Sequence, residues 1–288
     1  MSTAELSGAG YRGIPVLPWF RLLGSELRLT FGRRRNQVVL AVLVAIPVLI
    51  GVALRLQGHH GGDGEGPAFL EQITGNGVFL ALTALTLLLI LALPLNIAVV
   101  SGDSIAGEAG LGTLRYLLTV PAGRTRLLAV KYTALIIFSL AACLLVTVAA
   151  LIIGAILFPV GPVTLLSGTT ISLGAGLVRV LLVTVYVAAA MSALAAIGLA
   201  ISTLTEHAIA AMAAILVLVV GSEVADSVSQ FAVIHPFLPT HFWLAFDGLL
   251  RSPVDLGGVG HGLASFGAYA VIFWCVAWAQ FSTADVTS

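Results

Sequence analysis

Charged residues are scarce in this sequence. Asp, Glu, Lys and Arg make up only 9% of its 288 residues, against about 25% in an ordinary soluble domain. A soluble fold with so few charges could not cover its surface with groups that water solvates. Hydrophobic residues account for 59% of the chain, and the mean hydropathy is +1.09. The composition excludes a soluble enzyme and a disordered region, and it predicts an integral membrane protein.

Cysteines and recognisable catalytic motifs are also scarce. The two cysteines, Cys143 and Cys275, lie in apolar runs, which excludes a disulfide scaffold. The sequence contains no G-x-x-x-x-G-K-[ST] phosphate-binding loop, no H-E-x-x-H zinc motif and no G-x-S-x-G nucleophile elbow. We therefore expect that the chain is not an enzyme and that it binds no cofactor, metal or nucleic acid itself.

Long apolar segments dominate what is present. A helix needs about 20 apolar residues to cross a bilayer, and six segments reach or approach that length. The third is more than about 30 residues long, so it must tilt or project beyond the hydrocarbon core. We predict one all-α domain over residues 1–288 with six transmembrane helices. The predicted spans are 37–57, 78–101, 127–158, 177–204, 207–222 and 262–281.

Basic residues are concentrated on one predicted side of the membrane. Ten of the thirteen Lys and Arg residues either precede the first span or lie between the second span and the start of the third. The positive-inside rule places such segments in the cytoplasm. We therefore predict a multi-pass protein of the cell membrane with both termini in the cytoplasm.

The cytoplasmic N-terminus, residues 1–36, contains an amphipathic pattern. Over residues 19–31, Trp19 and the other apolar residues share a broad arc at 100° per residue, while Arg21 and Arg28 occupy the opposite face. This pattern is typical of a helix that lies among the lipids of the membrane interface. Glu26 falls inside the apolar arc. It either pairs with a cation of the adjacent cytoplasmic loop or reaches the headgroups.

The cytoplasmic connection 102–126 has the most informative pattern. Asp103 and Ser104 can cap a short helix, and the negative charge of Glu108 suits its first turn. Glycines then interrupt the chain, and a second short helix with a mixed apolar and charged surface follows before Pro121. Such a helix suits a groove on another protein, or it is an ordinary interfacial connector. The candidate coupling residues are Glu108, Gly112, Thr113, Leu114, Arg115, Leu117 and Leu118.

The outer segment 223–261 is semi-apolar and contains Pro236, Pro239 and Trp243. It is neither a clear span nor a polar loop, so we expect it to re-enter the outer leaflet against protein. The segment also contains His241, which lies six residues after His235. Two histidines beside Asp247 could perform acid–base chemistry on a lipid, which leaves a membrane-embedded lipid-modifying enzyme as an alternative.

Four sequence patterns resemble the type-2 ATP-binding-cassette (ABC) permease family. They are D-S-x-x-G-E, G-T-L-R-x-L-L and R-x-R-L-L-x-x-K in the cytoplasmic connection, and P-F-L-P-T-H-F-W in the outer segment. The resemblance implies an exporter in which two permease chains work with two separate ATPase subunits that bind ATP and Mg²⁺. It further implies that the helix around residues 113–118 docks on the ATPase as a coupling helix, and that the interfacial helix precedes the first span as an elbow.

The predicted function is export of a lipophilic substrate, such as a drug, an antibiotic or a lipid. The high content of Ala, Gly, Val and Leu is typical of a bacterial protein. An ATP-independent secondary transporter or channel is the main alternative. Such proteins usually carry ionisable residues at mid-membrane, and these are nearly absent from the predicted spans. The sequence does not identify the substrate. It also does not show whether the two permease chains of the exporter are copies of the same protein.

Overall fold

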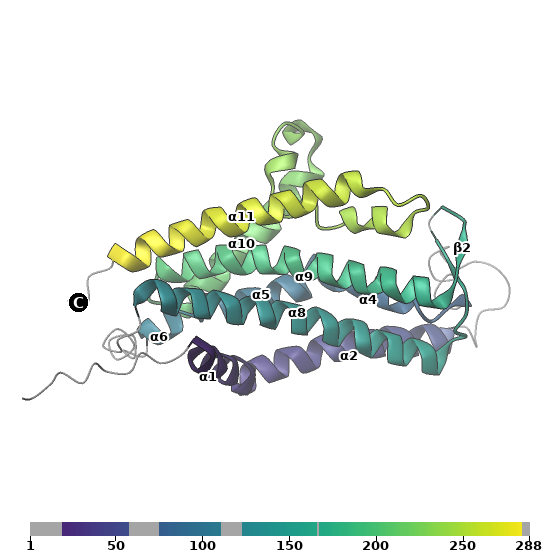
Figure 1. Cartoon of the computed structure of the whole chain (residues 1–288), viewed down its shortest axis with the longest axis horizontal. Helices are drawn as coiled ribbons and strands as arrows, with labels where there is room; N and C mark the ends of the chain where they lie inside the picture. The colour runs from purple at the N-terminus through teal and green to yellow at the C-terminus, as the bar shows by residue number, and fades with distance from the viewer. Residues whose placement is uncertain (1–18, 58–74, 111–122, 166, 284–288) are drawn as a thin grey trace, which may run out of the picture.

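The computed structural model describes residues 19–57, 75–110, 123–165 and 167–283 (Figure 1). Within these residues the chain is almost entirely helical, which confirms the predicted all-α membrane protein. The described strands are two short ones, β1 (Val163–Thr164) and β2 (Thr170–Ile171), which pair antiparallel in the connection between two long helices.

Five single helices are long and apolar enough to cross a membrane, and a bent pair of helices makes a sixth span when the pair is counted as one. Their ends differ from the predicted spans by only a few residues. The bundle consists of α2 (Arg34–Gln57), the pair α4 (Phe79–Ile90) and α5 (Ala92–Gly102), α8 (Arg124–Leu157), α9 (Leu173–Thr203), α10 (Ala208–Ser227) and α11 (Leu256–Thr283).

The second span is broken, whereas the sequence predicted a continuous one. Its two halves meet at 55°, and Leu91 between them has φ −144° and ψ −47°. Pro94 has no backbone N–H, so the carbonyl of Ile90 loses its normal helical donor and the helix bends. Five residues after the break, Asn96 is fully buried, and neither atom of its side-chain amide has a hydrogen-bond partner among the described residues.

Helix α9 is the centre of the bundle. It packs against α5, α8 and α11 and is the most deeply buried span, and Figure 1 shows it running between α8 and α11. Its Ala-rich second half lets neighbouring backbones approach closely. A Cβ added at Gly198 would lie 2.7 Å from the Cβ of Ser101 in α5, closer than such atoms approach in proteins.

The two ends of the bundle carry different structures. Helices α1 (Trp19–Gly32) and α6 (Ala106–Gly110) gather at one end with the start of α8 and the last turns of α11, and the β1–β2 pair lies at the opposite end (Figure 1). The N- and C-terminal helices therefore reach the same end of the bundle, as the predicted orientation requires. Which side of the membrane that end faces stays a prediction.

The segment between α10 and α11 contains three short 3₁₀ turns, η1 (Ser229–Phe231), η2 (His235–Phe237) and η3 (Ala245–Leu250). Phe242 accepts a hydrogen bond of 2.7 Å from the hydroxyl of Tyr186, which lies more than three turns into α9. Figure 1 shows the first part of this segment standing out from the side of the bundle beside α11, before the chain continues to the start of α11. Whether the segment re-enters the membrane stays a prediction.

Candidate functional site

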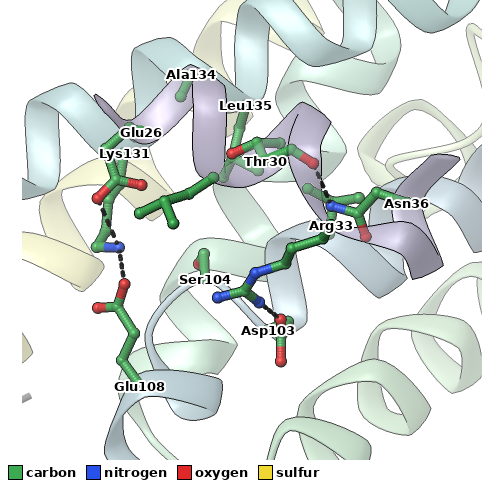
Figure 2. Close-up of a pocket in the computed structure, with 12 residues that line it drawn as sticks. Glu26, Thr30, Arg33, Asn36, Asp103, Ser104, Glu108, Lys131, Ala134 and Leu135 are labelled. Carbon is green, nitrogen blue, oxygen red and sulfur yellow. Dashed lines mark hydrogen bonds and ion pairs between the residues drawn. The ribbon is translucent and has the colours of Figure 1, made fainter. Parts of the chain in front are cut away.

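A buried cluster of three charges joins α1, α6 and α8 at the end of the bundle where α6 lies (Figure 2). The Lys131 ammonium lies 2.6 Å from a carboxylate oxygen of Glu108 and 3.2 Å from one of Glu26. The three side chains are only 3%, 10% and 13% exposed, respectively. Of the two alternatives for Glu26, the structure therefore shows pairing with a cation rather than contact with the headgroups.

Burial and charge act on Glu108 in opposite directions. Removal from water disfavours the ionised carboxylate and raises the pKa of Glu108, whereas the charge and the hydrogen bond of Lys131 lower it. Burial is the larger effect, so the net shift is upward. Lys131 therefore offsets only part of the cost of burying the Glu108 carboxylate.

A second ion-pair cluster lies beside the first. The Asp103 carboxylate, directly after α5, accepts hydrogen bonds from Arg33 at the junction of α1 and α2 and from Arg35 in α2, the latter at 2.9 Å. Asp103 thus binds arginines rather than capping α6, and the Ser104 hydroxyl donates back to the carbonyl of Ser101 instead of capping. The sequence prediction that these two residues cap a helix is wrong. A sequence alone does not show that Arg33 and Arg35, about 70 positions earlier in the chain, lie beside Asp103 in the fold.

The two clusters line one small cavity (Figure 2). Its volume of about 30 Å³ has room for little more than a water molecule. The amide of Asn36 closes one side by donating to the carbonyl of Thr30 at 2.8 Å. The site is thus a compact polar contact between helices, with no space for a substrate of drug size.

Ser202, in the last turn of α9, attaches the connection between α5 and α6 to the central helix of the bundle. Its hydroxyl accepts hydrogen bonds from the backbone N–H groups of Ile105 (3.1 Å) and Ala106 (2.9 Å) and donates to the carbonyl of Gly102 (2.8 Å). Ser202 is fully buried. The sequence did not single out Ser202, because Ser192 lies in a similar apolar context in the same helix, yet the Ser192 hydroxyl bonds only to a carbonyl of its own helix.

Of the candidate coupling residues, the structure describes one. Glu108 is buried in α6 and paired with Lys131. The other six lie outside the described residues: Gly112, Thr113, Leu114, Arg115, Leu117 and Leu118. The described part of the chain stops at Gly110 and resumes at Gly123. Both ends of the undescribed segment are thus attached to helices that belong to the buried clusters.

The expected interfacial helix corresponds to α1, and its position among the lipids of the membrane interface stays a prediction. Arg21 and Arg28 are exposed, Trp19 is half-buried, and no residue of α1 is fully buried. The helix packs on α8, where the rings of Phe31 and Phe138 lie 5.3 Å apart. Glu26 therefore anchors a helix that has little other buried surface.

The outer histidines have a different partner from the one predicted. His241 lies 2.6 Å and His235 lies 3.8 Å from a carboxylate oxygen of Asp226 at the end of α10, whereas Asp247 pairs with Arg251. The proposed His–His–Asp247 constellation is therefore wrong. The described residues contain no group of three His, Cys, Asp or Glu side chains that could hold a metal ion.

The remaining residues predicted in the outer segment have structural positions. Trp243 is buried, Pro236 is the second residue of η2, and Pro239 follows that turn. A hydrogen bond of 2.8 Å between Thr240 and Ser222 fixes this part of the segment to α10. Thr240 and Trp243 therefore hold this part of the segment against the bundle, whereas Pro236 is exposed.

Comparison with known families decides the class of protein. The family model described as "ABC-2 family transporter protein" matches residues 33–224. The chain belongs to this family. No curated protein matches the chain. As an ABC-2 permease, the chain is a membrane subunit of a transporter, and the family implies association with ABC ATPase subunits. The match includes Asp103, Lys131 and Ser202 and ends at residue 224, at the start of the outer segment 223–261.

Proposed function

We propose that this permease is the transmembrane subunit of an exporter that moves a lipophilic substrate at the expense of ATP hydrolysed by separate subunits. Its family and its apolar spans support a transport subunit. The given sequence has no phosphate-binding loop, which fits an energy source on separate ATPase subunits. The observation that carries the proposal is the attachment of the cytoplasmic connection to three membrane helices by buried polar contacts.

Those contacts explain how a force on the connection would reach the membrane. On one side of segment 111–122, α6 is bound to α8 through Lys131 and to α9 through Ser202. On the other side the chain continues directly into α8. A close-packed interior transmits such a displacement as a shift of whole helices rather than absorbing it locally. Movement of an ATPase bound to this segment would therefore tilt α8 and α9 together.

The proposed working unit contains two permease chains and two ATPase chains, with both permease termini in the cytoplasm. ATP and Mg²⁺ bind to the ATPase subunits. The substrate class is a lipophilic drug, antibiotic or lipid, because the spans contain few ionisable residues that could stabilise a charged cargo. Export would take place along the contact between the two permease chains.

The test measures ATP-driven transport by the permease co-purified with its ATPase and reconstituted in proteoliposomes. Leu114→Glu and Arg115→Glu should abolish transport and its coupling to ATP hydrolysis while leaving membrane insertion intact. Arg28→Glu, which reverses an exposed charge on α1 at the same end of the bundle, is the matched control and should keep transport. Transport by the permease alone, driven by an ion gradient, would instead support the secondary transporter.

A further inference from the structure

Two histidines share one carboxylate oxygen where α10 ends and the segment toward α11 begins. The Nδ1 atom of His241 lies 2.6 Å and that of His235 lies 3.8 Å from the same oxygen of Asp226. The centroids of the two imidazole rings are 5.9 Å apart. All three side chains are between 18% and 30% exposed. The cluster is thus partly shielded by protein but can still exchange protons with water.

His235 lies between two hydrogen-bond acceptors. Its Nε2 atom is 3.2 Å from the carbonyl oxygen of Val228, and its Nδ1 atom faces the carboxylate of Asp226. A neutral imidazole has a single N–H, so it can donate to only one of these oxygens and turns a lone pair toward the other. The doubly protonated imidazolium can donate to both. The surroundings of His235 therefore suit a ring that carries two protons.

His241 differs from His235 in this respect. A neutral His241 with its proton on Nδ1 already donates to Asp226 across the short distance of 2.6 Å. This contact does not depend on the uptake of a further proton. Only His235 needs a second proton to hold both of its partners, so a response to pH belongs to His235.

A cavity of about 70 Å³ lies beside the cluster and has room for water. It is lined by Asp226 and His241, and by Glu223 one turn earlier on α10. Helix α4 contributes only apolar residues to the lining, Leu89 and Ile90. The cavity therefore brings water, and with it protons, to the carboxylate that both histidines share.

The titratable groups that approach from other elements have partners of their own. The hydroxyls of Tyr186 in α9 and Tyr269 in α11 donate to backbone carbonyls of the segment. The ring of His261 in α11 stacks on a phenylalanine of the segment. Asp247 and Arg251 bond to each other. The charge at the cluster thus comes from the two histidines and the two acidic residues of α10.

The part of the segment that contains His235 has few other attachments. Neither η1 nor η2 contains a buried residue, and Val233 and Phe237 are 84% and 75% exposed. Figure 1 shows this part standing out from the side of the bundle. The following residues are fixed by Thr240 and by the buried Trp243, neither of which titrates. A region with few buried contacts opens locally at low cost, so one added bond changes how often it is attached.

We propose that His235 is a proton-binding site that fastens the turns η1 and η2 to the end of α10. When His235 takes up its second proton, Nδ1–H donates to Asp226 while Nε2–H keeps its bond to Val228. The attached state then binds more protons than the open state, so attachment strengthens as the pH falls. The permease would thereby respond to acid on the side of the membrane that this segment faces. The proposal is independent of ATP coupling.

The test uses the full-length permease in detergent, with ¹⁵N-labelled histidine. Nitrogen NMR shows which ring nitrogens carry protons, and the signals of His235 are identified by their absence from His235→Gln. Histidine changes charge between about pH 5 and 8. We therefore expect both nitrogens of His235 to be protonated at about pH 5.5 and one at about pH 8.

Hydrogen exchange of the backbone, followed by mass spectrometry, measures the attachment itself. After correction for the effect of pH on the intrinsic exchange rate, protection of residues 229–238 should be about threefold greater at the lower pH, the factor expected for a partly exposed ion pair. His235→Gln keeps an N–H donor for Val228 but cannot gain a charge, so it should abolish this difference. Asp226→Asn, which removes the charge that His235 faces, should abolish it too.

Two control variants should keep the difference in protection. His241→Gln retains an N–H donor for Asp226, and His261→Gln removes a titratable ring of the same region that lies outside the cluster. Four results would overturn the proposal: a singly protonated His235 at the lower pH, equal protection of the unmodified protein at both pH values, a difference that persists in His235→Gln, or a difference that is lost in either control.

Discussion

Removing the ammonium group of Lys131 should destabilise the permease strongly. Lys131→Met keeps an unbranched side chain of similar length but leaves the carboxylates of Glu26 and Glu108 buried near each other without the ammonium that lies between them. In the native protein these carboxylates lie 3.2 and 2.6 Å from the ammonium. The substitution therefore converts two favourable contacts into a repulsion at a site that water barely reaches.

The size of the effect follows from the geometry. At an effective dielectric constant of about 20, each contact contributes roughly 5–6 kcal/mol of attraction, most of which the desolvation of the charges offsets. Removing one partner from a buried ion pair typically costs about 3–5 kcal/mol. Burial already raises the pKa of Glu108. Protonation of this carboxyl group therefore relieves part of the cost. We therefore expect a loss of about 3 kcal/mol in the free energy of unfolding at neutral pH.

The measurement is equilibrium unfolding of the purified permease in detergent. The deficit should shrink as the pH falls, because protonated carboxylates no longer need a cation and a raised pKa favours the folded state below that pKa. The triple variant Glu26→Gln, Lys131→Met and Glu108→Gln should recover most of the stability, since it leaves no buried charge. Arg28→Met, at an exposed cation of α1, should stay within about 0.5 kcal/mol of the native protein. A stable Lys131→Met, or a triple variant no better than the single one, would refute the reasoning.

Three further substitutions have expected outcomes in the same unfolding assay. Ser202→Ala leaves two buried backbone N–H groups without their acceptor and should cost about 1–3 kcal/mol, whereas Ser139→Ala, buried but bonded only within its helix, should cost less. Gly198→Ala should push α5 and α9 apart and destabilise the fold, while Gly221→Ala, which meets no atom within 4 Å, should stabilise its helix by up to about 1 kcal/mol. Asn96→Leu removes a buried amide without a partner among the described residues and should increase stability by about 1–3 kcal/mol; a decrease would show that the amide is satisfied.

The sequence predicted the spans well because each span is a local property. About 20 consecutive apolar residues suffice to identify a membrane helix, and the structure places α2, α8, α9 and α11 within a few residues of their predicted ranges. The interfacial helix was also predictable, since its arc of apolar residues repeats at the helical period over a single short segment. Neither inference needed knowledge of which helices are neighbours.

Contacts between distant segments could not be predicted in the same way. Lys131 is 105 residues from Glu26, and Ser202 is 97 residues from Ile105. A lone Glu in an apolar arc indicated that Glu26 needed a partner but not which one. Pro94 was a visible signal for the break in the second span, although a proline in a membrane helix produces a bend only when neighbouring helices accommodate it. Ser202 carried no signal that distinguished it from Ser192.

Helix α9 connects the two ends of the permease, and this explains how distant segments can move together. At one end Ser202 holds the connection between α5 and α6. Near the other end Arg179 donates to the carbonyls of Leu249 and Arg251 in the outer segment, about 35 Å away along a continuous helix. A helix buried along most of its length cannot bend freely, because its neighbours already fill the space around it. A displacement of the connection between α5 and α6 would therefore be expected to shift α9 as a unit, and the segment between η3 and α11, which is bonded to α9, would follow it.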